Sequence, residues 1–408
     1  MEDDHAYIVE GCRTPIGKLG GILSSVRADD LAAIVIKSLL ERVPSFDPAL
    51  IDDVIMGCAN QAGEDNRNIA RMALLLAGLP VSVPGETVNR LCASGMSAIV
   101  QAYRAIRAGE GNCFIAGGVE HMTRSPWVIS KTQTPFGREA QMFDSSFGWR
   151  FINPEMKAMY GTEAMGETAE NLAELYDISR LRQDQFSAWS QEKTSQAMEN
   201  GRLSKEIIPV TVQLNKKQSL TCSQDEFPRP DTTVEALSGL RTAFRQNGTV
   251  TAGNSSGLND GAASLLIASG HFINQHKLTP LARIVSSGVS GVEPRCMGIG
   301  PVTASLLALS RAGLNMEDID IIELNEAFAA QVLACLNEWK LADDDSRINP
   351  NGGAIALGHP LGMSGARIVY SAALELHLTG KRYALCTMCI GVGQGYAVVL
   401  ENPAFDIQ

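Results

Sequence analysis

Short apolar runs alternate with amphipathic segments along most of the 408 residues. Apolar runs of strand length predict β-strands. In the first half these runs are AYIVEGC, DDVIMGC, GNCFIAGGVE and ASLLIAS, and in the second half ARIVSSGVSG, DIIELNE and YALCTMCIG. Apolar positions spaced by three and four predict a helix at 29–42, capped by Asp29, and one at 93–108 that ends at Gly109. This alternation is typical of an α/β protein with a largely parallel central sheet.

The pattern changes between 121 and 249. This stretch begins with aromatic residues, prolines and charges without clear periodicity, and continues with helical TAENLAELY and LRQDQFSAWSQEKTSQAMENG. Long irregular stretches in compact proteins are usually functional lids, subunit contacts or linkers, and the aromatic content disfavours disorder. We therefore predict an inserted loop domain at 121–249. A first half would comprise 1–120 and 250–270, and a second half 271–408.

The two halves resemble each other faintly. SGMSAIV at 94–100 matches LGMSGARIV at 361–369, and the same register places Asp53 opposite Asp320. Self-similarity at a long period indicates duplication of a folding unit. In this register Cys92 lies opposite His359 and Cys58 opposite Asn325.

Composition and charge narrow the class of protein. A formal net charge of −11 without a basic run argues against a nucleic-acid surface or an anionic membrane surface. The acidic start MEDDHAYIVEG lacks the basic and apolar regions of a signal peptide, and no stretch reaches transmembrane length. Nine cysteines without regular spacing fit a reduced, cytoplasmic setting. Six of them are interpreted as packing residues: Cys12, Cys58, Cys113, Cys222, Cys296 and Cys335.

Three glycine-rich stretches carry the candidate chemistry. Cys92 in NRLCASGMS lies at the start of a predicted helix, where free amides and the helix dipole should lower the pKa of its thiol. His359 in NGGAIALGHPLGMSG has small neighbours that would let an imidazole approach a ligand as a general base. Taken alone, Cys92 could equally be a buried core thiol, and a histidine beside a proline is more often structural. The other histidines are interpreted as structural or surface residues: His5, His121, His271, His276 and His377.

Two further candidates complete the set. Asn325 in ELNEAFAAQ could simply cap the following helix, but the repeat places it beside the same crevice at the strand ends. Cys389 closes Cys386-Thr387-Met388-Cys389, where a redox dithiol is the competing interpretation. A metal site would need a second pair of ligands, and we predict none. The glycines that follow, beginning with Gly391, fit amides that stabilise an oxyanion better than a dinucleotide loop.

These motifs resemble those of the thiolase family over essentially the whole chain. The matching segments are CRTPIGKLGG, NRLCASGMSAI, YGTEAMGETAEN, GTVTAGNSSGLNDGAA, ELNEAFAAQ, NPNGGAIALGHPLGMSGAR and CTMCIGVGQG. The resemblance implies an α/β thiolase fold with five layers, α/β/α/β/α, in which two similar halves are duplicated and a loop domain is inserted in the first.

The resemblance also implies roles. Cys92 would take up the acyl group, His359 would accept its proton, and Cys389 would act as acid and base at the α-carbon. One oxyanion site would use His359 with a water held by Asn325, and the other the amides of Cys92 and Gly391. Coenzyme A (CoA) is then a substrate, and no permanently bound cofactor or metal is expected.

Residues for CoA and an assembly follow from the same resemblance. Arg241 would lie near the adenine and phosphates, and four residues would line the pantetheine: Ser256, Ala252, Met165 and Phe328. Ser255 adds a hydroxyl close to this tunnel, where many relatives have alanine. Exposed aromatic residues in the insertion and the family habit favour a homotetramer built as a dimer of dimers.

Within the family, SSFGWRFINP, RCMGIGPV and YALCTMCIGVGQG are most similar to 3-oxoadipyl-CoA thiolases of aromatic-compound breakdown, which form succinyl-CoA and acetyl-CoA. The free carboxylate of that substrate would need a cationic partner, for which Arg138, Arg150 and Lys157 are candidates. A thiolase for monocarboxylic 3-ketoacyl-CoA, of the β-oxidation type, is the main alternative. A decarboxylating condensing enzyme would normally lack a cysteine at 389, and a non-catalytic acyl-CoA-binding relative would have lost the triad.

Overall fold

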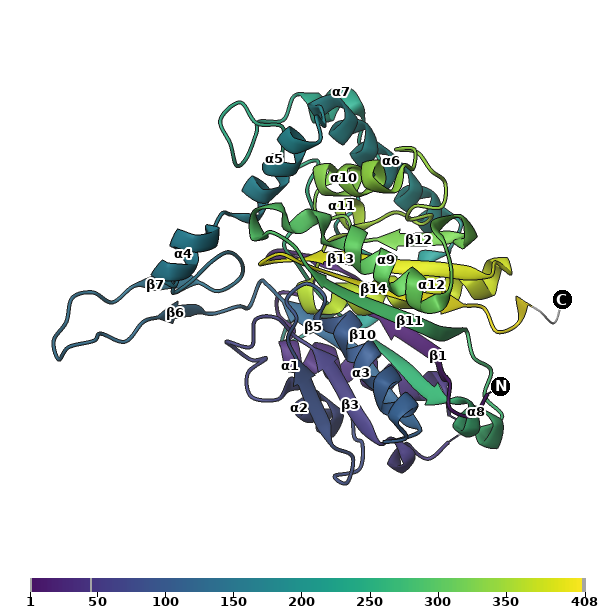
Figure 1. Ribbon diagram of the computed structural model, residues 1–408. Helices are drawn as coiled ribbons and strands as arrows, with labels where there is room; N and C mark the ends of the chain where they lie inside the picture. Colours follow the sequence, from purple (N-terminus) through teal and green to yellow (C-terminus); the bar gives the residue numbers. More distant parts are fainter. Residues whose placement is uncertain (1, 45, 406–408) are drawn as a thin grey trace.

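The computed structural model describes residues 2–44 and 46–405. One continuous sheet runs through the molecule in the order β12-β13-β14-β11-β1-β10-β5-β3-β4, with β2 paired to β10 (Figure 1). The first-half strands are β1 (Ala6–Arg13), β2 (Gly17–Lys18), β3 (Asp53–Gly57), β4 (Gly85–Val88), β5 (Cys113–His121) and β10 (Asn259–Ser269). The second-half strands are β11 (Ala282–Gly291), β12 (Ile321–Leu324), β13 (Tyr383–Ile390) and β14 (Gln394–Glu401). The halves join where β1 pairs with β11 over only two residue pairs.

The sheet is mixed, so the prediction of a largely parallel sheet is wrong. Among the strands of the described residues, β3 pairs in parallel with β4 and β5, and β12 with β13. The pairings β1–β10, β5–β10, β1–β11, β11–β14 and β13–β14 are antiparallel. The physical reason is that β10 returns beside β1 after the long insertion and that β13 and β14 form a hairpin, whereas parallel pairs require a crossover.

Helices complete five layers, which confirms the predicted fold class. In the middle layer α3 (Ser94–Ala108) and α12 (Leu361–Thr379) pack together between the two halves of the sheet. On the outer faces, α1 (Ala28–Arg42) and α2 (Ile69–Leu76) cover the first half. The second half is covered by α9 (Gly300–Ala312) and α10 (Ala329–Trp339). The smaller helices are α8 (Gly270–His276), α11 (Ala354–Leu357) and 3₁₀ turns at Pro48–Leu50, Leu203–Lys205, Pro294–Ile299 and Met316–Asp318.

Of the two helix ends that the sequence predicted, one is confirmed and the other is wrong. The helix α3 ends at Gly109, whose φ of 74° is in the left-handed region, as predicted. The helix α1 is capped by Arg27, which offers no capping side chain. Asp29 lies inside the first turn, where its carboxylate accepts hydrogen bonds from the Arg27 guanidinium at 2.9 and 3.0 Å. The predicted capping role of Asp29 is therefore wrong.

The two halves have the same strand order, with β1-β10-β5-β3 matched by β11-β14-β13-β12. Asp52 accepts hydrogen bonds from the amides of residues 112 and 113 at the start of β5. Asp320 accepts the same pair from residues 382 and 383 at the start of β13. Asp52 and Asp320 are therefore equivalent, one residue away from the predicted register. Asn325 then lies opposite Gly57 rather than Cys58.

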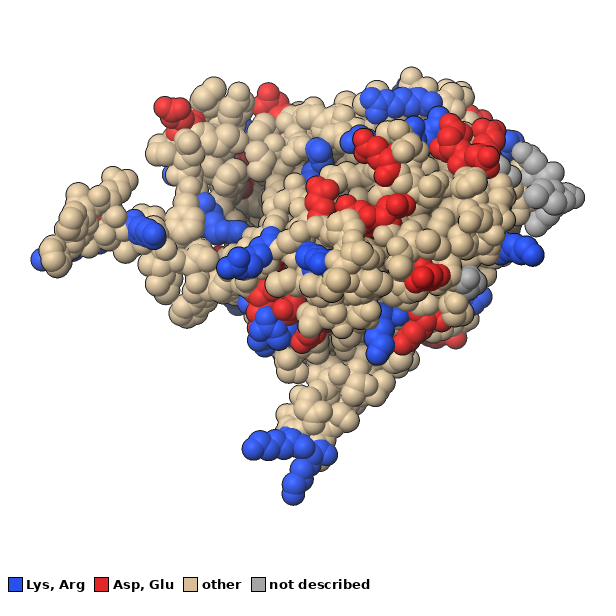
Figure 2. Space-filling model, turned by 90° about the horizontal axis from the view of Figure 1, so that it is seen from below, with Lys and Arg blue, Asp and Glu red and all other residues tan. Residues whose placement is uncertain are grey.

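Residues 121–249 hold two hairpins and four helices. The hairpins are β6 (Trp127–Ile129) with β7 (Met142–Asp144), and β8 (Val210–Asn215) with β9 (Gln218–Cys222). The helices are α4 (Pro154–Tyr160), α5 (Met165–Leu175), α6 (Arg180–Glu199) and α7 (Val234–Ser238). The β6–β7 hairpin projects far from the body of the molecule in Figures 1 and 2. The proposed domain boundaries stay a prediction.

Two glycines let the middle layer approach the first half of the sheet. A Cβ at Gly118 in β5 would collide with the carbonyl oxygen of Gly362 in α12. A Cβ at Gly362 would collide in turn with the carbonyl oxygen of Val119. Only glycine allows this close contact, which holds the start of α12 against the carboxyl end of β5.

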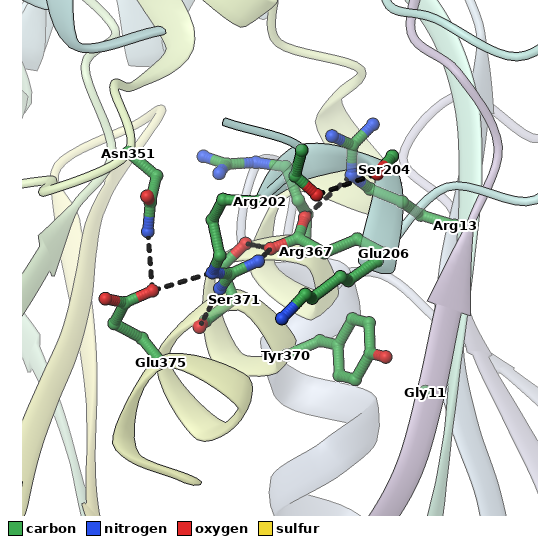
Figure 3. A network of polar contacts seen from close by, with 12 residues as sticks. Gly11, Arg13, Arg202, Ser204, Glu206, Asn351, Arg367, Tyr370, Ser371 and Glu375 are labelled. Atoms are coloured by element: carbon green, nitrogen blue, oxygen red, sulfur yellow. Dashed lines mark hydrogen bonds and ion pairs between the residues drawn. The ribbon is translucent and has the colours of Figure 1, made fainter. Parts of the chain in front are cut away.

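A buried ionic network ties the insertion to both halves (Figure 3). Glu206 pairs with Arg13 of β1 at 2.9 Å and with Arg202 at 2.8 Å. Arg202 also pairs with Glu375 of α12 at 2.7 Å, and Arg13 with Asp225 at 2.7 Å. On the face in Figure 2, acidic and basic side chains are interspersed. Within the described residues, no helix is both long and apolar enough to cross a membrane.

Candidate active site

Cys92 lies in a tight turn between β4 and α3. The preceding Leu91 has a φ of 46°, a left-handed conformation that is uncommon for a bulky residue. Two side chains hold this turn: the Asn89 side-chain oxygen accepts the Leu91 N–H at 2.8 Å, and the Ser94 hydroxyl donates to the Leu91 carbonyl at 2.6 Å. The residue as a whole is partly exposed. The turn fixes its sulfur at the start of α3.

The expectation that the helix start activates the Cys92 thiol is wrong for the free protein. Burial raises the pKa of the thiol to about 11. The backbone N–H groups of Gly391 and of Cys92 itself favour the thiolate and lower the pKa by less. Desolvation of a thiolate outweighs the local amides here, so the resting nucleophile is a neutral thiol.

His359 is buried, and its hydrogen bonds define its tautomer. The Ser364 hydroxyl lies 2.7 Å from Nδ1 and donates to the Pro360 carbonyl at 2.8 Å. Because the Ser364 hydroxyl donates its only proton to that carbonyl, it must accept a hydrogen bond from Nδ1–H. The lone pair of the imidazole is therefore on Nε2. Burial, helped by the Arg367 guanidinium, lowers the pKa of His359 to about 4. The imidazole is therefore neutral, with a free base at Nε2.

The loop that carries His359 is anchored by the first half of the chain. The Asn259 side chain accepts the His359 backbone N–H at 2.9 Å and donates to the Gly17 carbonyl at 3.0 Å. Gly358 has a φ of 103°, and a Cβ there would lie 2.5 Å from the Asn259 amide. The sequence reasoning did not single out Asn259 or Ser364, although the NDGAA motif contains the first.

Asn325 follows β12 and is fully buried. Its backbone N–H donates to the Thr387 carbonyl of β13 at 3.0 Å, and its side-chain Nδ2 lies 3.5 Å from His359 Nε2. Its Oδ1 has no hydrogen-bonding partner among the described residues. Since α10 begins only at Ala329 with Phe328 as its cap, Asn325 is not a helix cap. A buried amide with an unused oxygen beside a catalytic base candidate fits a ligand-binding role.

Cys389 lies near the end of β13, beside the Cys92 turn. Burial raises its pKa well above the ordinary value, and the nearby Cys92 thiol raises it further. Cys386 lies three residues earlier on the same strand, so the two side chains leave opposite faces. Cys386 contacts the Ile368 carbonyl of α12, whereas Cys389 belongs to a separate apolar cluster. This arrangement disfavours the redox-dithiol interpretation.

The structure thus brings five predicted residues to the carboxyl ends of the strands. The Gly391 backbone N–H lowers the pKa of Cys92, Cys92 is close enough to Cys389 to raise the pKa of Cys389, and Asn325 contacts His359. Together they offer a thiol, an unprotonated imidazole, a second thiol and backbone donors. Such a set can form an acyl-enzyme and move a proton to or from carbon.

The predicted pantetheine residues fall into two groups. Phe328 and Met165 pack with Cys389 in the same apolar cluster, and Ser256 donates its N–H to the Ala327 carbonyl at 3.0 Å. Ala252 and Arg241 are exposed on the preceding loop, which leaves Arg241 accessible to a phosphate. The structure adds Phe244, which contacts the Phe328 ring edge-on at a centroid distance of 6.2 Å.

Ser255 does not present a free hydroxyl to this surface. Its side chain is buried and donates to the Thr251 carbonyl at 2.7 Å.

Glu120, at the carboxyl end of β5, was also missed. Its carboxylate accepts the amide of Ala59 at 3.0 Å, that of Asn60 at 3.1 Å and that of Gly362 at 2.8 Å. Burial raises its pKa to about 7. Glu120 thereby connects the loop after β3 to the start of α12, close to His359. A single glutamate in GGVEHM carries no sequence signal for this bridge.

Comparisons with known proteins agree with the geometry. The family profile "Thiolase, N-terminal domain" matches residues 6–271, and "Thiolase, C-terminal domain" matches residues 278–402. Among solved structures, the human mitochondrial 3-ketoacyl-CoA thiolase has a TM-score of 0.91 at 40% identity, covering 98% of this chain and 99% of that one. The Bacillus anthracis acetyl-CoA acetyltransferase has a TM-score of 0.90 at 39% identity, covering 98% of both chains.

Curated relatives share more of the sequence. A protein of Escherichia coli K12 named 3-oxoadipyl-CoA/3-oxo-5,6-dehydrosuberyl-CoA thiolase is 60% identical, covering 97% of this chain and 99% of the relative. A β-ketoadipyl-CoA thiolase of Acinetobacter baylyi is 55% identical over 98% of this chain and 99% of its own. A 3-ketoacyl-CoA thiolase of Erwinia tasmaniensis is 47% identical, covering 98% of this chain and 100% of the relative.

Proposed function

Because the chain belongs to the thiolase family, we propose that it cleaves 3-oxoadipyl-CoA with CoA to give succinyl-CoA and acetyl-CoA. The observations that support the reaction are the two neighbouring thiols, Cys92 and Cys389, and the neutral imidazole of His359 beside Asn325. The substrate rests on relatives at 55 to 60% identity whose names contain 3-oxoadipyl-CoA or β-ketoadipyl-CoA.

In the first half-reaction, His359 Nε2 takes the proton of the Cys92 thiol as the sulfur attacks the 3-keto carbon. The imidazolium so formed can donate a hydrogen bond to the developing oxyanion, with Asn325 holding a water beside it. The bond between C2 and C3 then breaks. The succinyl group stays on Cys92, and Cys389 protonates the α-carbon of the acetyl-CoA that leaves.

In the second half-reaction, the CoA thiol gives its proton to Cys389 and attacks the Cys92 thioester. The amides of Cys92 and Gly391 stabilise the tetrahedral oxyanion, and both already favour negative charge on the Cys92 sulfur by lowering its pKa. Succinyl-CoA leaves, and the His359 imidazolium returns its proton to the departing Cys92 sulfur, which restores both groups. The chemistry uses only groups of the chain, with CoA as a substrate rather than a resident cofactor.

CoA binding is assigned to the surface beside this site. Met165, Phe328 and Ser256 line the pantetheine with Ala252 at its outer end, and Phe244 extends the aromatic wall. Arg241 reaches the adenine and phosphates. The protein acts in the cytoplasm as a homotetramer, and the exposed Trp127, Ile129 and Phe136 of the projecting β6–β7 hairpin favour contacts between subunits.

The alternative is a thiolase for monocarboxylic 3-ketoacyl-CoA, favoured by the 47% identity to a 3-ketoacyl-CoA thiolase. The two functions share every catalytic group and differ in the acyl pocket. The deciding experiment compares CoA-dependent loss of 3-oxoadipyl-CoA, acetoacetyl-CoA and a medium-chain 3-ketoacyl-CoA, with Cys92→Ala as control. Preference for 3-oxoadipyl-CoA, abolished in Cys92→Ala, is expected. Preference for a monocarboxylic substrate would contradict the substrate assignment.

A further inference from the structure

Arg150 is a half-buried cation held without a carboxylate partner. Its guanidinium donates to the Asn60 side-chain oxygen at 3.0 Å and to the Ser145 carbonyl at 3.3 Å. No ion pair within the described residues involves Arg150. Because a guanidinium has five N–H groups, most of its donors remain for a ligand.

Asn60 places this cation at the catalytic end of the sheet. Asn60 follows β3, and its backbone N–H donates to Glu120, which also binds the start of α12. The carbonyl of the preceding Ala59 accepts a hydrogen bond from Asn89 at 2.9 Å, and Asn89 holds the turn of Cys92. Two short chains of hydrogen bonds therefore lead from Arg150 to the Cys92 turn and to the helix that follows His359.

The residue before Arg150 connects the same segment to the CoA side. The Trp149 indole donates to the Glu163 carbonyl at 3.2 Å, just before α5 begins at Met165. Met165 packs against the cluster that contains Cys389. The segment 145–150 is thus hydrogen-bonded both to the loop after β3 and to the residue two positions before α5, so it lies between the Cys92 side and the CoA side of the site.

Other cations of this region are already engaged. Arg124 pairs with Glu64, Arg245 with Glu167 and Arg295 with Glu163. The guanidinium of Arg90 stacks on the Tyr396 ring at 5.4 Å and donates to Gln394 at 3.3 Å.

The other two candidates from the sequence lie on the surface. Arg138 is exposed on the β6–β7 hairpin and Lys157 on α4. A cation in such a position is solvated and has many conformations, so it would bind a carboxylate weakly.

We propose that Arg150, oriented by Asn60, binds the distal carboxylate of a dicarboxylic acyl group and so determines the acyl specificity of this thiolase. The proposal rests on the function proposed above and deepens it. A carboxylate that enters a partly desolvated site needs a charged donor. The planar fork of arginine matches a carboxylate, and its orientation by Asn60 lowers the entropy lost on binding. Asn60 is itself fixed by its donation to Ser125 at 2.8 Å.

The test compares two substrates of equal chain length, 3-oxoadipyl-CoA and 3-oxohexanoyl-CoA, which carry a carboxylate and a methyl group at the distal end. In Arg150→Gln the ratio of their kcat/KM values should fall roughly 10- to 100-fold, while kcat/KM for 3-oxohexanoyl-CoA is retained. Arg150→Lys keeps the charge without the fork and should lose part of the ratio. Asn60→Asp keeps Arg150 but gives its guanidinium a carboxylate partner within the protein, so it should also lower the ratio of the two kcat/KM values.

Arg138→Gln and Lys157→Gln remove the same charge from the exposed surface and should leave the ratio unchanged. The proposal would be overturned by an unchanged ratio in Arg150→Gln, by a fall in the ratio in one of these two instead, or by equal loss of both substrates. The last result would mark a structural role. A wild-type enzyme that does not prefer 3-oxoadipyl-CoA would instead contradict the proposed substrate itself.

Discussion

At the scale of single residues, the two central groups of the site are both uncharged before substrate binds. Burial raises the pKa of Cys92 to about 11 and lowers that of His359 to about 4. Between these values a thiol faces a neutral imidazole rather than a thiolate facing an imidazolium. Proton transfer is therefore coupled to attack on the substrate, where the oxyanion donors become occupied.

This state can be measured by alkylation. Only the thiolate reacts with iodoacetamide, so the rate of labelling of Cys92 should rise about tenfold per pH unit from pH 7 to 10. Mass spectrometry of the peptide that contains Cys92 would follow the label, with Cys92→Ala as the blank. A rate that levels off by pH 8 would show an activated thiolate and contradict the account.

Ser364 should matter through His359 alone. Ser364→Ala leaves the buried Nδ1–H without its acceptor, which typically costs about 1–3 kcal/mol, so kcat should fall roughly 10- to 100-fold. Ser305→Ala is a matched control, because the buried Ser305 hydroxyl has no partner among the described residues. Equal activity of the two variants would argue against the assigned tautomer.

The sequence alone predicted Cys92, His359, Cys389 and Asn325 as site residues because each lies in a distinctive short motif. It failed on the protonation state of Cys92, because the burial that raises the pKa of this thiol depends on how the chain packs around the turn, which a short motif does not reveal. Asn259 and Ser364 were missed for a related reason, since they act by holding the His359 loop.

At the scale of elements, the sequence predicted the seven apolar strands but not how they pair. Strand direction depends on partners such as β1 and β10, which are separated by the whole insertion. The strand β14 and the short β4 were not predicted at all. The edge strand β4 has little apolar character, with one buried residue of four.

Glu120 connects β5, the loop after β3 and α12, and both of its carboxylate oxygens accept amide donors. In Glu120→Gln, the side-chain NH₂ group would replace one of the two oxygens and would face a backbone N–H donor instead of accepting from it. At pH 8, above its pKa of about 7, this change should lower the free energy of unfolding by about 1–3 kcal/mol and should also lower kcat.

Denaturant titration and steady-state kinetics would check both effects of Glu120→Gln. Glu110→Gln, at an exposed position after α3, provides the control. Unaltered stability would show that the bridge is unimportant.

At the scale of the whole molecule, Glu206 holds the insertion, β1 and α12 together (Figure 3). Burial opposes its ionisation, but Arg202 and Arg13 prevail and lower the pKa of Glu206 to about 2. Glu206→Gln removes the negative charge that the buried guanidinium groups of Arg13 and Arg202 share. Stability to denaturant should fall by about 3–5 kcal/mol.

The same network predicts the pH dependence of stability. A carboxylate with a lowered pKa stabilises the fold fully above its unfolded value of 4.5, and that stabilisation is lost as pH falls toward 2. The difference between wild type and Glu206→Gln should therefore shrink over this window, whereas exposed Glu41→Gln should match wild type throughout. A difference that does not change with pH would contradict the charge on Glu206.

The most direct test of the central claim is a single turnover of 3-oxoadipyl-CoA without free CoA. We predict release of acetyl-CoA and a succinyl thioester on the peptide that contains Cys92, which is discharged as succinyl-CoA when CoA is added. Absence of the succinyl group from Cys92, with acetyl-CoA still released, would contradict the account.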